Sequence, residues 1–204
     1  MLWGVLLVGY PLIVFVLLRR YSARYAALFL LVLFLPGFVR RGLRYREGLL
    51  TVAFQAAGVS LLLGLAALFD SRVFLLHLPV LITLFLLVSF AYTLIRPPTM
   101  IERYARLGTR DLTDEEVRYC TSLTWLWIVF FLFNGLLIEG LILWTSFEIW
   151  TLYVGVIGYL LVGLLFALEL VYRRWRFGRF GLGWLDRSFN RLFGRAGDGE
   201  GGGD

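Results

Sequence analysis

The sequence predicts an all-α fold, a polytopic transmembrane helical bundle of about six spans. Of its 204 residues, 60% are hydrophobic, and the mean hydropathy is +0.80. The apolar residues gather in runs near the ~20 residues that an α-helix needs to cross a bilayer. Bends that carry arginine separate these runs, and all 20 basic residues are arginine. A soluble chain of this length has no use for such runs.

Six apolar runs are the expected spans. The first two are short and are interrupted by Gly9-Tyr10-Pro11 and by Pro36-Gly37. A re-entrant or partly inserted first hairpin, with five or fewer full crossings, therefore stays open as an alternative. The expected spans are residues 2–18, 25–39, 48–69, 73–95, 120–143 and 150–172.

Residues 96–119 form the one long polar interruption and separate two hydrophobic blocks. Pro97-Pro98 must end the fourth span, because proline cannot continue a helix and pushes the preceding residue out of the α region. Thr113 and Glu116 have the spacing of a capping box, which begins the next helix. Between Pro98 and Thr113 we expect a short helix on the membrane surface. The alternative is that this stretch is only a connector between spans. The apolar face of the helix would hold Met100, Ile101, Tyr104 and Leu107, and its polar face Glu102, Arg103 and Arg106.

The arginines predict the orientation of the spans. With six crossings, all but four of the 20 arginines fall on one side, which the positive-inside rule assigns to the cytoplasm. Both termini would then be cytoplasmic, in a multi-pass protein of the bacterial inner membrane. The exceptions are Arg19, Arg20, Arg24 and Arg72.

Residues 173–195 are expected to form a basic amphipathic segment on the membrane surface, and the glycine-rich, acidic residues 196–204 a disordered tail. The net charge of +6 comes from arginines beside apolar runs. Anionic lipid headgroups are therefore the expected partners, and nucleic acid is not.

Polar residues in apolar spans are candidate functional groups because burying them in lipid is costly. Glu169 and Arg173 have the spacing of a helical ion pair. Asn134 is expected to bond to a neighbouring helix, and Glu139 to reach the membrane interface. The candidate functional residues are Glu102, Arg103, Asn134, Glu139, Glu169 and Arg173.

Small residues indicate where membrane helices approach closely. Ala56, Ser60 and Gly64 repeat every four residues on one helix face, and Gly155, Gly158 and Gly163 supply small positions in the last span. Aromatic residues near the predicted span ends are expected to form belts at the membrane interfaces. These are Trp125, Trp127, Trp144, Trp150 and Tyr153.

The sequence indicates no catalytic, cofactor-binding or metal-binding residues. Cys120 has no nearby histidine to activate it, and a single histidine, His77, excludes a histidine-rich metal site. An enzyme is therefore the less favoured interpretation, and no cofactor is expected.

Two motifs carry a resemblance to a known family. RPPTMIERYARL and LTDEEVRYCTSLTWLWIVFFLFNG, followed by a span with Gly158 and Glu169, resemble a family of predicted bacterial inner-membrane proteins often encoded near aryl-polyene lipid genes. The chain is more distantly similar to intracellular septation protein A. That resemblance implies a non-enzymatic envelope role with division or elongation proteins as partners. The tail beyond Arg176 departs from the septation protein.

Three functional hypotheses follow. The leading one is a non-enzymatic scaffold or accessory factor in cell-envelope or division processes. The alternative is a small transporter or lipid-handling protein, for example for polyene-type lipids, with a cavity lined by Asn134, Glu139 or Glu169. An intramembrane enzyme acting on a lipid substrate has the least support.

Overall fold

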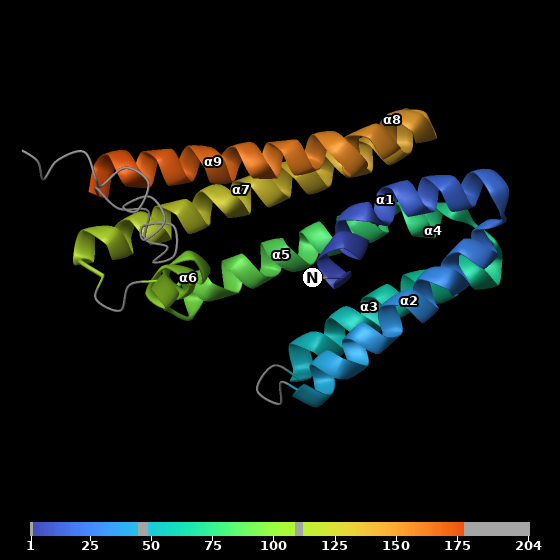
Figure 1. Cartoon of the computed structure of the whole chain (residues 1–204), viewed down its shortest axis with the longest axis horizontal. Helices are drawn as coiled ribbons and strands as arrows, with labels where there is room; N and C mark the ends of the chain where they lie inside the picture. Colours follow the sequence, from blue (N-terminus) through green and yellow to red (C-terminus); the bar gives the residue numbers. More distant parts are fainter. Residues whose placement is uncertain (1, 45–48, 109–111, 178–204) are drawn as a thin grey trace, which may run out of the picture. The chain divides into compact units, whose positions relative to one another are not determined.

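The computed structural model describes residues 2–44, 49–108 and 112–177, and every regular element in them is a helix. The all-α prediction is therefore confirmed for the described residues. The segment 178–195 of the predicted surface helix and the tail 196–204 lie outside them. The elements are α1 Leu2–Arg20, α2 Ala23–Arg44, α3 Leu49–Phe69, α4 Arg72–Leu76, α5 Leu78–Ile95, α6 Met100–Gly108, α7 Asp114–Trp144, α8 Phe147–Leu152, the π-helix η2 Tyr153–Ile157, and α9 Gly158–Phe177 (Figure 1).

Three helical stretches among the described residues are long and apolar enough to cross a membrane: Arg72–Ile95, Asp114–Trp144 and Phe147–Arg176. Two shorter apolar helical stretches, Ala23–Gly37 and Gln55–Phe69, accompany them. These helices have the character of a helical membrane protein. The full set of six crossings stays a prediction.

Prolines end helices at one place and not at two others. α5 ends at Ile95, directly before Arg96 and Pro97-Pro98, as predicted. The expected interruptions at Pro11 and Pro36 are wrong, because α1 and α2 run through both residues. A single proline removes one backbone hydrogen bond and disfavours the helical conformation of one preceding residue, which transmembrane helices tolerate. Two consecutive prolines remove two adjacent N–H donors and disfavour the helical conformation of two successive residues.

The chain separates into two compact units. Unit 1 comprises Met1–Val88 and Val129–Leu160, and unit 2 comprises Ser89–Ile128 and Leu161–Asp204. Each is described by its own contacts below.

In unit 1, α2 and α3 pack side by side as a pair (Figure 1). The turn after α3 is tied to the start of α2, because the Arg24 backbone N–H donates to Asp70 Oδ1 at 2.7 Å and Arg24 Nε donates to the Ala67 carbonyl at 3.0 Å. Asp70 has a positive φ of 47°, a conformation that aspartate tolerates better than most residues. One core of unit 1 is built from Tyr10, Val14, Ala26, Ala27, Leu30, Leu63, Ala66, Leu75 and Leu78.

A second core of unit 1 joins α4, α7, α8 and η2. It contains Leu76, Ile138, Trp150, Tyr153 and Val154. Unit 2 has an aromatic core in which the Trp127 ring lies 4.7 Å from Phe166 and 6.4 Å from Phe90, measured between ring centroids. Trp127, Trp150 and Tyr153 are thus buried, so the belt prediction is wrong for these three residues. Their rings lie on helix faces that meet other helices, while Trp125 and Trp144 are exposed.

Candidate functional site

Unit 2 gathers buried polar side chains from α6, α7 and α9. The first pair is the predicted one: Arg173 Nε donates to Glu169 Oε1 at 2.7 Å, and Arg173 Nη2 lies 2.6 Å from the same oxygen. The two side chains are 12% and 10% exposed, so the ion pair is largely sheltered. The Arg173 guanidinium lies 5.6 Å from the centroid of the Tyr119 ring, which stacks on Tyr172. Rings from α7 and α9 therefore cover the pair.

The second pair lies within α6. Arg106 Nη2 and Nε donate to Glu102 Oε1 at 2.6 and 2.9 Å, and the Glu102 side chain is only 8% exposed. Pairing with a charge one helical turn away lets a carboxylate be buried that would otherwise stay in water. Glu102 thus lies on the covered face of α6 and not on the solvent face that the sequence predicts.

The outward face of α6 carries apolar side chains. Ile101 and Ala105 are buried beside Glu102, whereas Tyr104 is 58% exposed and Leu107 is 84% exposed. Arg103 is exposed as well, on the side of Leu107 away from Ile101, and its Nε donates to the Pro98 carbonyl at 2.9 Å. The predicted apolar face of α6 is therefore only partly covered. Ile101 faces the protein, whereas Tyr104 and Leu107 face away from it. We call Arg103, Tyr104 and Leu107 the α6 outer face.

The start of α7 is capped as predicted. The Thr113 backbone N–H donates to Glu116 Oε2 at 2.9 Å, and the Glu116 N–H donates to Thr113 Oγ1 at 3.3 Å. This reciprocal pair is a capping box. One residue earlier, Glu115 accepts a 2.6 Å bond from Arg176, which ties the start of α7 to the end of α9.

Cys120 lies buried in the middle of this polar cluster. Arg173, Glu102, Glu169 and Glu116 are the charged residues around it. A cysteine nucleophile uses a neighbouring base, most often histidine. The one histidine of the chain, His77, belongs to unit 1, and Cys120 belongs to unit 2.

Unit 1 brings two further candidate residues to partners. Asn134 Oδ1 on α7 accepts a 2.7 Å hydrogen bond from the Tyr153 hydroxyl on η2, which confirms the expected bond to a neighbouring helix. Glu139 Oε1 lies 3.4 Å from His77 Nε2. The opposite ring nitrogen, Nδ1, is 2.7 Å from the Val73 carbonyl and must donate to it. Sequence reasoning missed the His77–Glu139 pair because no local spacing joins residues 62 positions apart.

The predicted packing glycines have different surroundings. A Cβ at Gly155 would meet Pro11 Cβ at 3.6 Å, so this glycine lies against α1, and one at Gly158 would meet the Tyr153 carbonyl at 3.3 Å. At Gly64 and Gly163, no atom of the described residues lies within 4 Å of such a Cβ. Ala56 and Ser60 are half-buried. For the face of Ala56, Ser60 and Gly64, contact with another helix stays a prediction.

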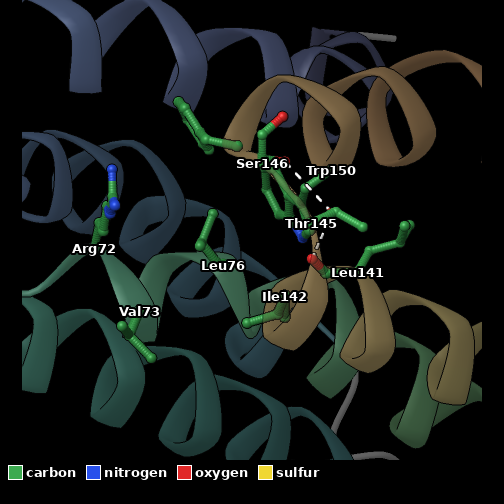
Figure 2. Close-up of a pocket in the computed structure, with 9 residues that line it drawn as sticks. Arg72, Val73, Leu76, Leu141, Ile142, Thr145, Ser146 and Trp150 are labelled. Carbon is green, nitrogen blue, oxygen red and sulfur yellow. Dashed lines mark hydrogen bonds between the residues drawn. The ribbon is translucent and has the colours of Figure 1, made fainter.

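A pocket of about 150 Å³ lies in unit 1, where α4, α7 and α8 meet. Figure 2 shows Arg72 and Val73 on one side of it, and Thr145, Ser146 and Trp150 on the other. Leu76, Leu141, Ile142 and Phe147 complete the lining. The three residues expected around a transport cavity, Asn134, Glu139 and Glu169, do not line this pocket.

Comparisons of the chain with protein-family models, with curated proteins and with solved structures found no match. In the described residues, no group of three or more histidine, cysteine, aspartate or glutamate side chains could hold a metal ion.

Proposed function

We propose that the protein is an integral protein of the bacterial inner membrane, with both termini in the cytoplasm. It acts without catalysis, as a scaffold or accessory factor in cell-envelope or division processes. The observation that carries this proposal is the contrast in unit 2 between buried polar groups that pair with each other and the exposed α6 outer face.

The internal pairs favour a binding role over a chemical one. Glu102 and Glu169 each bond an arginine of their own helix, and Glu116 bonds the backbone that it caps. Carboxylates held in this way compensate the charge of a neighbouring arginine or cap a helix. An intramembrane enzyme would instead need a general base or nucleophile that faces its substrate.

The α6 outer face favours a membrane-surface partner. An exposed tyrosine and leucine beside arginine suit the layer where headgroups meet acyl chains. Anionic lipid headgroups supply the counter-charge for Arg103. A helix seated there presents unit 2 to envelope or division proteins at the cytoplasmic face, and nucleic acid plays no part in this proposal.

A complementation experiment tests the proposal. Deletion of the gene should alter cell shape or envelope integrity, and the wild-type protein should restore both. The combined variant Arg103→Ala, Tyr104→Ala, Leu107→Ala should reach the membrane at normal levels and fail to restore them. The matched control on α7, Arg118→Ala, Trp125→Ala, Leu126→Ala, should restore them. Normal shape and envelope integrity in the deletion strain would contradict the proposal.

A second candidate is a small transporter or lipid-handling protein, for example for polyene-type lipids. The His77–Glu139 pair favours it, because ionisable groups within apolar helices often mark proton or substrate pathways. In a strain that depends on the protein for lipid export, Glu139→Gln should abolish export, while Glu148→Gln, an exposed glutamate of α8, should not. Unchanged export in Glu139→Gln would remove this candidate.

A further inference from the structure

A threonine near the end of α5 holds the start of α6. Thr93 is 2% exposed, and its Oγ1 accepts a hydrogen bond from the Met100 backbone N–H at 2.9 Å. The same hydroxyl donates to the Phe90 carbonyl, one turn earlier in α5, at 2.8 Å. All three residues belong to unit 2, where α6 lies at the end of α5 (Figure 1). One side chain therefore joins the last turn of α5 to the first residue of α6.

The first turn of α6 needs such a partner from outside the helix. The leading N–H groups of a helix have no carbonyl within that helix to bond. Pro97 and Pro98 carry no N–H, and they prevent α5 and α6 from forming one continuous helix. A helix of nine residues is also too short to be stable by itself in water. The position of α6 therefore depends on its contacts with the rest of unit 2.

The bond to the next element distinguishes Thr93 from two other buried threonines. Thr83 on α5 and Thr124 on α7 are 7% and 0% exposed, and each hydroxyl donates to the carbonyl four residues earlier in its own helix. Such a bond lies within one helix. The Thr93 hydroxyl bonds a carbonyl of its own helix in a similar way, and it also accepts from α6. The acceptor atom of Thr93, and not its burial alone, connects the two elements.

The same attachment limits how α6 can turn about its axis. Ile101 and Ala105 are buried, and they follow the residue that Thr93 holds. With its first residue bonded to α5 and this row of side chains covered, α6 leaves Tyr104 and Leu107 exposed. The orientation of the α6 outer face thus depends on the bond to Thr93 together with the covered row.

We propose that Thr93 is the positioning residue that keeps the α6 outer face toward the membrane surface. This inference rests on the proposed function, in which that face contacts anionic headgroups and the acyl chains below them. Without the acceptor, the Met100 N–H loses its partner at a part-buried position, and α6 separates from α5 more often. The outer face then loses its fixed orientation.

Hydrogen–deuterium exchange of the full-length protein in lipid nanodiscs tests the attachment. Thr93→Val keeps the shape of the side chain and removes the acceptor, so the α6 backbone amides should exchange at least about fivefold faster, as expected for one lost hydrogen bond. Thr93→Ser, which keeps the hydroxyl, should restore the wild-type rate. The matched controls Thr83→Val and Thr124→Val should not change it. Unchanged α6 exchange in Thr93→Val, or an equal increase in Thr124→Val, would overturn the inference.

A spin label separates failure of this inference from failure of the proposed function. The label is attached to Leu107→Cys in the Cys120→Ala background, in nanodiscs that contain phosphatidylglycerol. It should collide more often with oxygen, which dissolves in lipid, than with a water-soluble nickel complex, and Thr93→Val should shift this preference toward the nickel complex. A preference for nickel with Thr93 intact would refute the proposed function, and the positioning role with it. A preference for oxygen that Thr93→Val leaves unchanged would refute this inference alone.

A second variant breaks the same hydrogen bond from the side of α6. Proline suits the first position of a helix and lacks the N–H that Thr93 accepts, so Met100→Pro removes the bond and keeps the threonine. If Thr93→Val does not fold, Met100→Pro decides. Faster exchange of the α6 amides is the expected result, and exchange at the wild-type rate would overturn the inference.

Discussion

Glu169 and Arg173 form a largely buried ion pair in unit 2. Both side chains are nearly buried, and each would leave an uncompensated charge in an apolar setting if its partner were removed. Removal of one partner from a buried ion pair is strongly destabilising, even where the intact pair contributes little compared with apolar residues.

We therefore predict that Arg173→Gln lowers the free energy of unfolding by about 3 kcal/mol. The control Arg176→Gln breaks the pair with Glu115, in which both side chains are about half exposed, and should lower the free energy of unfolding much less than Arg173→Gln does. Reversible unfolding of the purified protein in mixed detergent micelles measures both values. Equal effects of the two variants would show that burial does not govern the strength of these pairs.

Residue spacing predicts contacts within a helix and fails for contacts between helices. The Glu169–Arg173 pair and the Thr113–Glu116 capping box lie four and three residues apart, so helical geometry alone brings their atoms together. The partner of Glu139 depends on how α7 packs against other elements. That packing arises from many apolar contacts, and no single contact can be recognised in the sequence.

At the level of elements, glycine position decides how closely helices approach. A Cβ at Gly58 on α3 would lie 3.2 Å from Leu81 Cδ2 on α5, which is a tight contact, whereas Gly64 on the same helix has open space within the described residues. The sequence pattern gives Gly64 the packing role because it repeats with Ala56 and Ser60. The pattern contains no information on which face α5 covers.

We predict that Gly58→Leu destabilises the protein by about 1–3 kcal/mol, because the added side chain forces α3 and α5 apart. Gly64→Leu should be neutral or slightly stabilising, because leucine favours the helix more than glycine does. Thermal unfolding of both variants in the same detergent compares them directly. Strong destabilisation by Gly64→Leu would instead show that this face packs against another helix in the protein as it exists in the membrane.

The α6 helix shows how far element-level prediction reaches. Its existence and its start after Pro97-Pro98 follow from local rules. Its orientation does not, because burying Glu102 depends on the ion pair with Arg106 and on the covering residues of unit 2. The protein covers only one edge of the apolar stripe of α6, at Ile101 and Ala105, and leaves Tyr104 and Leu107 exposed.

At the scale of the whole molecule, the uncovered apolar surface is the main property to explain. In an apolar 18-residue segment of each of the three long stretches, at most 28% of the residues are buried inside the chain. The apolar side chains that remain must contact lipid or other membrane helices, because water would not tolerate so much exposed surface.

Two of the arginines that conflict with the predicted orientation have acidic neighbours. The Arg24 backbone donates to Asp70, and Arg19 lies 3.9 Å from Glu148. The distribution of arginine also remains strongly one-sided with these residues included. The proposed orientation, with residues 96–119 in the cytoplasm, therefore keeps its basis in the positive-inside rule.

The most direct test is cysteine accessibility in intact cells. The background is Cys120→Ala. In one variant a single cysteine replaces Arg118, near the start of α7. In the other it replaces Glu148 in α8, which follows the end of α7. A membrane-impermeant maleimide should label the cysteine at 148 in cells whose inner membrane is intact, and the cysteine at 118 only after that membrane is permeabilised. Both variants should stay in the membrane fraction after alkaline washing. Labelling of the cysteine at 118 in intact cells, or recovery of the protein in the soluble fraction, would contradict the proposed membrane topology.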